Sequence, residues 1–272
     1  MTLRDTSTAL HALDLHRRGN IEPQLLKKVI DCVYSHNTHL RQLGIYLHGE
    51  TCLVLRCISS CRALTSLKLS LYSRGSYDKT LFPKSLNLPA LTGLDLTNFA
   101  FSGDENGHVE PFLTFTRLNS LVISSCVVKD AQILRISSET LVNLAMHGNS
   151  FHFTKIELSA SSLCTFTISG SLDHKICGSG LSSVKHVNID AQQNFVEEEH
   201  ASVLLSWLLD LANVESLKVT SPIIQVLCHV FGLYFTFFLR CFFYFLNFVE
   251  IQLTCIKLIL IHSHCLDSLL SS

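Results

Sequence analysis

The chain has 272 residues, a formal net charge of −1 at pH 7 and 16% charged residues. No run of Lys or Arg occurs, so we expect no nucleic-acid partner. The eleven cysteines are odd in number and lack a disulfide framework spacing, and no Asn-x-Ser/Thr triplet is present. The first residues, "MTLRDTSTALHALDLHRRG", hold no apolar signal core. These features predict a reduced compartment, cytoplasmic or nuclear, and count against an extracellular receptor.

A short phrase recurs along the chain. "LTSLKL" begins at Leu64, "LTGLDL" at Leu91 and "LNSLVI" at Leu118. Each has leucine, two variable residues, leucine, one variable residue and an aliphatic residue, which is typical of a leucine-rich repeat. When any aliphatic residue or Phe is allowed at these positions, further copies begin at Leu10, Leu40, Leu141, Leu163, Val184 and Val214. The nine copies are 21 to 30 residues apart, close to the ~20–29 residues of this repeat class.

This pattern predicts an α/β fold, a right-handed leucine-rich-repeat solenoid (horseshoe) over residues 1–227. Short parallel strands would turn their aliphatic side chains into one shared core, with helices or irregular segments on the outer side. We therefore expect Leu67, Leu94, Leu121 and Leu144 to align on adjacent strands. Cys126 and Asn149 each lie three residues after the last aliphatic of a copy. In such repeats this side chain satisfies backbone groups in the turn.

Two segments between the phrases have the pattern of amphipathic helices. In "NIEPQLLKKVIDCVY", Asn20 is the expected N-cap and Pro23 lies in the first turn. The expected buried stripe of this helix is Leu25, Leu26, Val29, Ile30 and Val33. In "NFVEEEHASVLLSWLLDL", Asn194 and Glu197 have the spacing of a capping box. We expect Trp207 in that helix to be a core residue rather than a platform for a ligand.

The variable residues of each phrase are small or polar and should face solvent. Most of them need no role beyond solvation, but a stacked sheet face is also where such proteins bind partners. The candidate partner-binding residues are Lys68, Asp95, Asn143, His147, His186 and Asn188. The sequence does not identify the target protein that they would bind.

The sequence predicts no metal, cofactor or catalytic site. Cys57 and Cys61 are spaced Cys-x3-Cys, but a zinc site needs about four ligands and no second pair follows at motif spacing. The group His262, His264 and Cys265 has the same deficiency. "CGSG" at 177–180 is too short for a phosphate loop, and no nucleophile-elbow phrase frames a serine. We therefore expect a protein that is not an enzyme.

Residues 228–272 form a tail that does not follow the repeat. The tail holds eight of the seventeen Phe residues of the chain. Ile223–Phe248 is long enough to span a bilayer of ~30 Å, although Arg240 interrupts it at a cost. The tail could instead cap the last repeat, or it could be the translation of thymine-rich non-coding DNA such as a retained intron. All three interpretations stay open at this point.

The repeats resemble those of plant F-box/leucine-rich-repeat proteins, the group that often ends in an FBD domain. The resemblance covers about Arg4 to Val226, and its most specific pieces are "LFPKSLNLPALTGLDL" and "LVISSC". It implies that the repeats present a target protein in a cullin-RING ubiquitin ligase. In that family the F-box helices hold the ligase adaptor, and their Leu-Pro-led phrase is not found here. We therefore expect no adaptor docking by this chain. The alternatives are a ligase-independent leucine-rich-repeat binding protein and a single-span membrane-anchored one.

Overall fold

The computed structural model describes most of the chain between residues 10 and 220, with gaps. The described residues are 10–20, 22, 24–25, 27–29, 31, 39–48, 54–55, 58–59, 61–72, 79–104, 106–148, 155–170, 174–179, 181–191, 203, 207, 211, 214–220 and 249–251.

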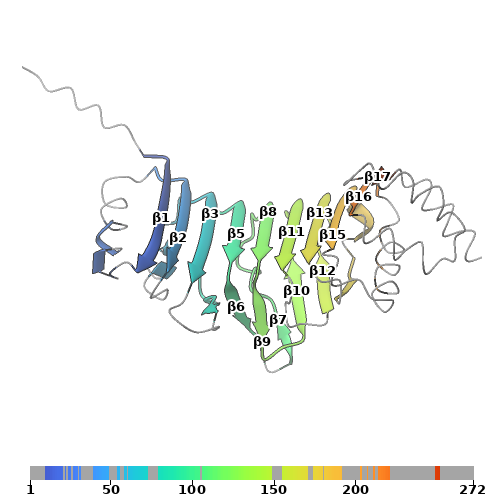
Figure 1. Cartoon of the computed structure of the whole chain (residues 1–272), viewed down its shortest axis with the longest axis horizontal. Helices are drawn as coiled ribbons and strands as arrows, with labels where there is room; N and C mark the ends of the chain where they lie inside the picture. The colour runs from blue at the N-terminus through green and yellow to red at the C-terminus, as the bar shows by residue number, and fades with distance from the viewer. Residues whose placement is uncertain are drawn as a thin grey trace, which may run out of the picture.

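A ten-stranded sheet runs the length of the molecule (Figure 1). Its strands in spatial order are β1 (Ala12–Asn20), β2 (Gln42–His48), β3 (Ser66–Tyr72), β5 (Gly93–Thr97), β8 (Ser120–Ser124), β11 (Asn143–Gly148), β13 (Thr165–Gly170), β15 (His186–Ala191), β16 (Ser216–Val219) and β17 (Val249–Ile251). The first nine pair in parallel, and each carries one copy of the repeated phrase. The copies predicted from sequence are therefore successive strands of one sheet.

The register of this sheet confirms the expected alignment of the aliphatic residues. Leu67 pairs with Leu94, Leu94 with Leu121, and Leu121 with Leu144. The same row extends to Leu13 at one end and Leu217 at the other. Because side chains alternate between the two faces of a strand, a one-residue slip would expose the whole row. The apolar pattern thus specifies the register.

A backbone ladder repeats with the same period just before each strand. The carbonyl of Thr65 accepts hydrogen bonds from the N–H groups of Thr92 and Gly93 at 2.8 and 2.9 Å. The carbonyl of Thr92 accepts in the same way from Asn119 and Ser120, at 2.7 and 2.9 Å. The carbonyl of the residue after the first aliphatic of each copy therefore links one turn of the solenoid to the next by two hydrogen bonds.

Two smaller parallel sheets form the other sides of the middle turns. One has three strands: β4 (Thr80–Leu81), β6 (Phe99–Ser102) and β9 (Val127–Lys129). The other has four: β7 (His108–Val109), β10 (Ile133–Ser137), β12 (Lys155–Ser159) and β14 (Lys175–Cys177). The expected solenoid of parallel strands is therefore confirmed, but its middle turns are walled by β-strands, so it is a β-solenoid and not the α/β horseshoe that was expected.

The amount of helix is smaller than the sequence analysis predicted. The middle turns return through short strands, and described helical residues lie only near 24–31, 54–58, 203 and 207, with a 3₁₀ turn at Leu181–Ser183. The reason lies in segments such as "VVKDAQILRIS", where β10 alternates buried and partly exposed residues. A period of two is the pattern of a half-buried strand rather than of a helix.

Residues with a left-handed backbone conformation turn the chain from the large sheet into the three-stranded sheet. Asn98 and Ser125 have φ values of 66° and 50°, and each lies two residues after the last aliphatic of its copy. The Sγ of Cys126 contacts the carbonyls of Leu96 and Ser124 at 3.6 and 3.5 Å, as a donor. This confirms the turn-satisfying role expected for Cys126, whereas Asn149 lies outside the described residues.

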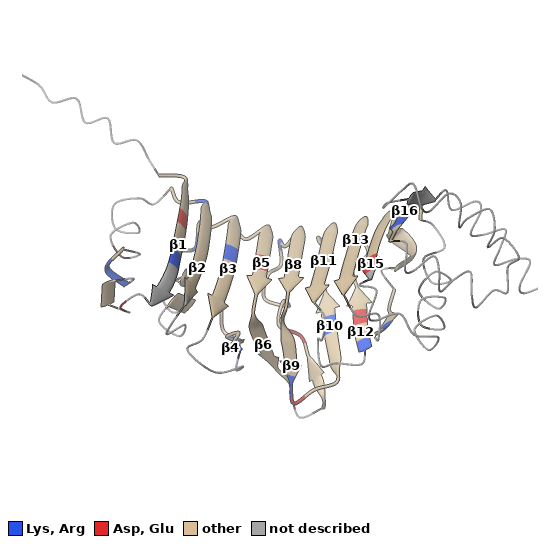
Figure 2. Cartoon of the chain, in the orientation of Figure 1, with Lys and Arg blue, Asp and Glu red and all other residues tan. Residues whose placement is uncertain are grey.

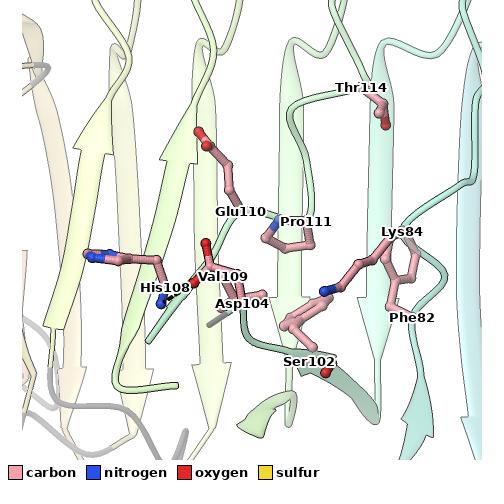
Figure 3. Close-up of a pocket in the computed structure, with 10 residues that line it drawn as sticks. Phe82, Lys84, Ser102, Asp104, His108, Val109, Glu110, Pro111 and Thr114 are labelled. Atoms are coloured by element: carbon pink, nitrogen blue, oxygen red, sulfur yellow. Dashed lines mark hydrogen bonds between the residues drawn. The ribbon is translucent and has the colours of Figure 1, made fainter. Parts of the chain in front are cut away.

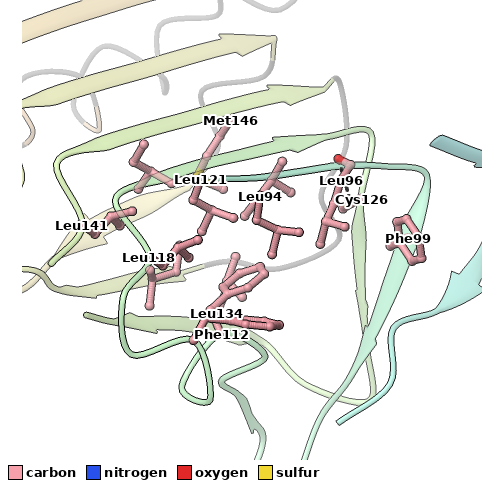
Figure 4. Packing of buried hydrophobic residues seen from close by; sticks show 14 of the residues in the cluster. Leu94, Leu96, Phe99, Phe112, Leu118, Leu121, Cys126, Leu134, Leu141 and Met146 are labelled. Atoms are coloured by element: carbon pink, nitrogen blue, oxygen red, sulfur yellow. Dashed lines mark hydrogen bonds between the residues drawn. The ribbon is translucent and has the colours of Figure 1, made fainter. Parts of the chain in front are cut away.

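The core lies between the three sheets and is continuous along the solenoid (Figure 4). Leucines of the large sheet cover one side, and a group of phenylalanines fills the space beneath them. Phe82 is central to this group, with ring centroids 5.7 Å from Phe99 and 5.8 Å from Phe101 in edge-to-face geometry, an arrangement that aromatic pairs favour. Near the C-terminal end, Trp207 is 1% exposed and donates its Nε1–H to the carbonyl of His174 at 3.0 Å. Trp207 is thus a core residue, as predicted.

The prediction for the first helix was wrong at two positions. Asn20 belongs to β1 and is not a helix N-cap. Leu25, assigned to the buried stripe, is 47% exposed. β1 is the first described strand of the sheet. The helical segment near residues 24–31 therefore has no earlier described turn to pack against, and the apolar side of this segment is not fully covered. The expected capping residues Asn194 and Glu197 lie outside the described residues.

The tail is described only at β17. Its backbone pairs antiparallel with β16, so this strand departs from the parallel order of the repeats. Ile223–Phe248, the candidate membrane span, lies outside the described residues. In the part of the chain that the structure does describe, no helix is both long and apolar enough to cross a bilayer.

Candidate functional site: the polar face of the large sheet

We call the side of the ten-stranded sheet that faces away from the core the polar face. Its residues alternate with the buried aliphatics, so β5 and β8 each alternate partly exposed and buried positions. All six candidate residues lie on this face. Lys68, Asn143 and His186 are exposed, and Asp95, His147 and Asn188 are half-buried.

The sheet brings some of these residues together and separates others. Lys68 on β3 is in register with Asp95 on β5, so the two are direct neighbours. Asn143 and His186 are each in register with Thr165, one on either side of β13. The candidates therefore form one continuous face with a close charged pair at one end, and they do not gather into a single cluster.

Asp95 has an altered proton affinity because of its position. Partial burial raises the pKa of this carboxyl group, while the nearby positive charges of Lys68 and His147 act in the opposite direction. Burial disfavours the charged form of an acid. The ionised Asp95 is therefore held at some cost, and a partner that supplies a donor or a positive charge would relieve it.

His147 is oriented by the next strand. Its Nδ1 lies 2.7 Å from the Oγ of Ser169 on β13, within hydrogen-bond distance. Ser169 is in register with His147, so the pair crosses directly from strand to strand. Such cross-strand pairs stabilise a sheet face. The contact fixes the imidazole plane and leaves Nε2 as the ring nitrogen able to meet a partner.

Asn188 has an unsatisfied acceptor. Its Oδ1 is buried and lacks a hydrogen-bond partner among the described residues. An unmade hydrogen bond at a buried polar atom costs roughly 1–3 kcal/mol. Because neighbouring groups cover this oxygen, the cost falls on the sheet itself, and the exposed part of Asn188 is what a partner could meet.

Charges of both signs are scattered over the large sheet (Figure 2). Lys68 and Lys218 contribute positive charge to the polar face, and Asp14, Asp95 and Asp190 contribute negative charge. Neither sign dominates. Such a face has no electrostatic preference for a polyanion and is suited to a polar protein surface of mixed charge.

Sequence reasoning missed a notch on this face at Gly44. Gly44 on β2 is in register with Asp14 on one side and Lys68 on the other. A Cβ added at Gly44 would overlap the carboxylate of Asp14 and approach the ring of Tyr46 at 3.3 Å. The glycine therefore makes room for the Asp14 carboxylate to lie across β2. A glycine at a variable position of the phrase was the signal that could have indicated it.

A cavity of about 220 Å³ lies at the free edge of β7, away from the polar face (Figure 3). Phe82, Phe101 and Val109 form its apolar side, and the polar groups of Lys84 and Glu110 also line it. No motif in the sequence had indicated this cavity, because its walls come from two successive turns.

Several hydrogen bonds hold the loop beside the cavity. The Oδ1 of Asp104 accepts hydrogen bonds from the N–H groups of Asn106 and His108 at 3.0 and 2.9 Å. These bonds, that of His108 first, lower the pKa of Asp104. Lys84 Nζ donates to the carbonyl of Gly103 at 3.3 Å, and His108 Nδ1 is buried without a partner in the described structure.

The residues considered for metal and phosphate binding are described only in part. Cys61 is buried, while Cys57, His262, His264 and Cys265 lie outside the described residues. The described structure contains no group of three His, Cys, Asp or Glu residues placed to hold a metal ion. In "CGSG", Cys177 ends β14 and Gly178 packs against the backbone of Leu158. This packing makes Gly178 part of the solenoid wall.

The chain was compared with known proteins. No model of a known protein family matches it, and no curated protein is significantly similar to it in sequence.

Proposed function

We propose that the chain is a protein-recognition scaffold whose polar face binds a target protein. The observation that carries the proposal is the in-register row of nine parallel strands, which presents a continuous array of polar side chains. Repeat proteins use such extended surfaces for binding. The partly buried Asp95 supports this choice of face, because a partner that supplies a positive charge would stabilise its ionised form.

We further propose that the solenoid is of the leucine-rich-repeat class. The phrase spacing and the bonding of Cys126 to the turn carbonyls support this. On the resemblance to plant F-box/leucine-rich-repeat proteins, we propose that this recognition serves a cullin-RING ubiquitin ligase in the cytoplasm or nucleus. The polar face would hold the target, and ubiquitin transfer would be the task of other subunits. Docking to the ligase adaptor is not assigned to any residue here.

Recognition by the polar face is tested by quantitative affinity capture with two matched triple variants. One replaces Lys68, Asp95 and His147 by Ala on the polar face. The control replaces Arg135, Lys155 and Glu157 by Ala on the four-stranded sheet, which faces another side. We expect captured proteins to be lost only with the first variant. Equal loss with both variants, or capture that is unchanged with the first, would contradict the proposal.

The ligase setting needs a separate measurement. Pull-down of the chain with the purified ligase adaptor distinguishes a ligase subunit that carries its own adaptor surface from a recognition region that does not. We expect no direct binding, and a stable complex would reveal an adaptor-binding surface on the solenoid. A target that binds the polar face but is not ubiquitylated in cells would favour the ligase-independent alternative.

A further inference from the structure

The loop before β7 contains Asn106–Gly107, the only Asn-Gly pair in the sequence. The side-chain carbonyl carbon of an asparagine can be attacked by the backbone nitrogen of the next residue, which closes a succinimide ring and releases ammonia. Glycine hinders this attack least, because it has no Cβ and adopts a wide range of backbone conformations. The surroundings of the pair in the fold therefore determine how readily the ring can close.

Gly107 lies in open space. A Cβ added at Gly107 would meet nothing within 4 Å, and its φ is +74°. Its N–H donates to the carbonyl of Asp104 at 3.2 Å, which is at the long end of the usual range of about 2.7–3.2 Å. The nitrogen that would attack is therefore held by a weak bond inside one loop.

The side chain of Asn106 is free to turn while its backbone is anchored. Asn106 is exposed, and its side-chain amide makes no hydrogen bond to any residue in the described part of the chain. Its backbone N–H donates to the Oδ1 of Asp104 at 3.0 Å. An anchored backbone beside a free side chain allows the two reacting groups to meet within one loop.

Asn119 provides a comparison within the same chain. It is also exposed, and a small residue, Ser120, follows it. The N–H of Ser120 donates to the carbonyl of Thr92 at 2.9 Å, and the carbonyl of Asn119 accepts two N–H groups of the next turn at 2.8 and 3.0 Å. Both sides of this peptide bond are held in the ladder between turns. The fold therefore favours ring closure at Asn106 and opposes it at Asn119.

We propose that Asn106 is a self-modification site, which the chain converts to aspartate and isoaspartate. The backbone nitrogen of Gly107 bonds to Cγ of Asn106 and gives its proton to water, and the side-chain nitrogen takes up a proton and leaves as ammonia. Water then opens the ring at one of its two carbonyl carbons. Attack at Cγ gives aspartate, and attack at the backbone carbonyl carbon gives isoaspartate. In total one water is consumed and one ammonia is released, without oxidant or reductant.

Either product changes the loop at the free edge of β7. It adds a carboxylate two residues from that of Asp104, and like charges at this spacing repel each other. Isoaspartate also adds one carbon atom to the backbone. The loop is closed by the Asp104 N–H, which donates to the carbonyl of His108 at 2.8 Å, and by the His108 N–H, which donates to the Oδ1 of Asp104 at 2.9 Å (Figure 3). Because β7 pairs with β10 at only two residues, the longer backbone should loosen this pairing and alter the adjoining cavity.

The test is peptide mapping by mass spectrometry of the full chain after incubation at neutral and mildly alkaline pH. Because a small misplacement of a nucleophile costs up to about 100-fold in rate, we expect Asn106 to convert about 10- to 100-fold faster than Asn119. The rate should rise with pH, because the deprotonated nitrogen is the nucleophile. An isoaspartyl methyltransferase, which labels the free α-carboxylate, distinguishes isoaspartate from aspartate.

Two matched variants and a denatured sample separate the fold from the sequence. Asn106→Gln should abolish conversion at this position, because its longer side chain closes a ring much more slowly, whereas Asn119→Gln should leave conversion of Asn106 unchanged. In urea, where the ladder is lost, the ratio of the two rates should shrink. Conversion of Asn106 no faster than that of Asn119 in the folded chain, or a ratio that urea does not reduce, overturns the proposal.

Amide hydrogen exchange measures the effect on β7. The N–H of Gln132 donates to the carbonyl of Gly107 at 3.2 Å. This amide should exchange faster in the aged chain than in the fresh chain, and at the same rate in fresh and aged Asn106→Gln. A converted chain whose Gln132 amide exchanges as before would contradict the loosening of β7.

Discussion

Gly178 and Gly107 show two separate reasons for glycine in this solenoid. Both have positive φ, +139° and +74°. A Cβ at Gly178 would overlap the backbone carbonyl of Leu158, whereas a Cβ at Gly107 meets nothing within 4 Å. Gly178 is therefore required by both the backbone conformation and the close approach of two turns, and Gly107 by the backbone conformation alone.

The two glycines make a matched pair of substitutions. Gly107→Ala should lower the free energy of unfolding by roughly 1–2 kcal/mol through backbone strain. Gly178→Ala should cost a further ~1–3 kcal/mol, because the wall must shift to admit the methyl group. Urea unfolding followed by circular dichroism measures both. Equal losses would mean that Gly178 does not pack against Leu158 as described.

Glu157 carries the strongest charge interactions described. It pairs with Lys155 at 2.7 Å and with Arg135 at 2.8 Å, and hydrogen bonds from Lys155 and then Arg135 lower its pKa to about 2. Because the folded pKa lies below the unfolded value of about 4.3, the contribution to stability is present above that value. It is lost as the pH falls through about 2.

Glu157→Gln should therefore lower the melting temperature at pH 7 and have a much smaller effect near pH 2. Because the pair is partly solvated, the loss at pH 7 should be about 1 kcal/mol or less. Glu139→Gln, at an exposed glutamate outside this network, serves as the control. Thermal unfolding across pH 2–7 tests the prediction, and a difference between the variant and the parent that is as large at pH 2 as at pH 7 would count against it.

At the scale of the elements, the stacking of β3, β5, β8 and β11 depends on the leucine row. Leu121 is 0% exposed and lies between Leu94 and Leu144 on the adjacent strands. Its side chain therefore touches the turns on both sides. Each strand alternates buried and exposed side chains. Because the buried leucines of successive strands stack in one row, the turns share a single core.

Leu121→Ala should reduce the free energy of unfolding by about 2–5 kcal/mol, from lost burial and the remaining cavity. Leu81→Ala, at the 55% exposed leucine of β4, should change it by less than about 0.5 kcal/mol. Chemical unfolding midpoints compare the two. Similar effects for the two leucines would contradict the assignment of Leu121 to the shared core.

At the scale of the whole molecule, each turn contacts chiefly its neighbours. The stability of such an array is close to a sum of turn and interface contributions. The middle turns have a neighbour on both sides, whereas β1 at the open edge has one described neighbour. We therefore expect stability to fall from the middle toward that end.

Amide hydrogen exchange tests this gradient. The amides of β8 and β11 should be protected most, and those of β1 and β2 least, because end turns open without disrupting the rest. Uniform protection from β1 to β16 would mean that the array unfolds as one cooperative unit.

The sequence alone determined the large sheet. Spaced aliphatics at a 21 to 30 residue period fix nine strands, their parallel order and the residues on the polar face, because a repeat that cannot bury its apolar side alone must stack. The local sequence pattern also predicted that Cys126 satisfies backbone groups in its turn and that Trp207 is a core residue.

Only the tertiary structure determined which residues of different turns lie next to each other. It showed that the middle turns return through strands rather than helices, that Lys68 neighbours Asp95 while Asn143 and His186 are separated by β13, and that a cavity lies at the free edge of β7. The spacing of residues along one chain does not specify which side chains of successive turns meet, because that depends on the lengths and bends of the connecting segments.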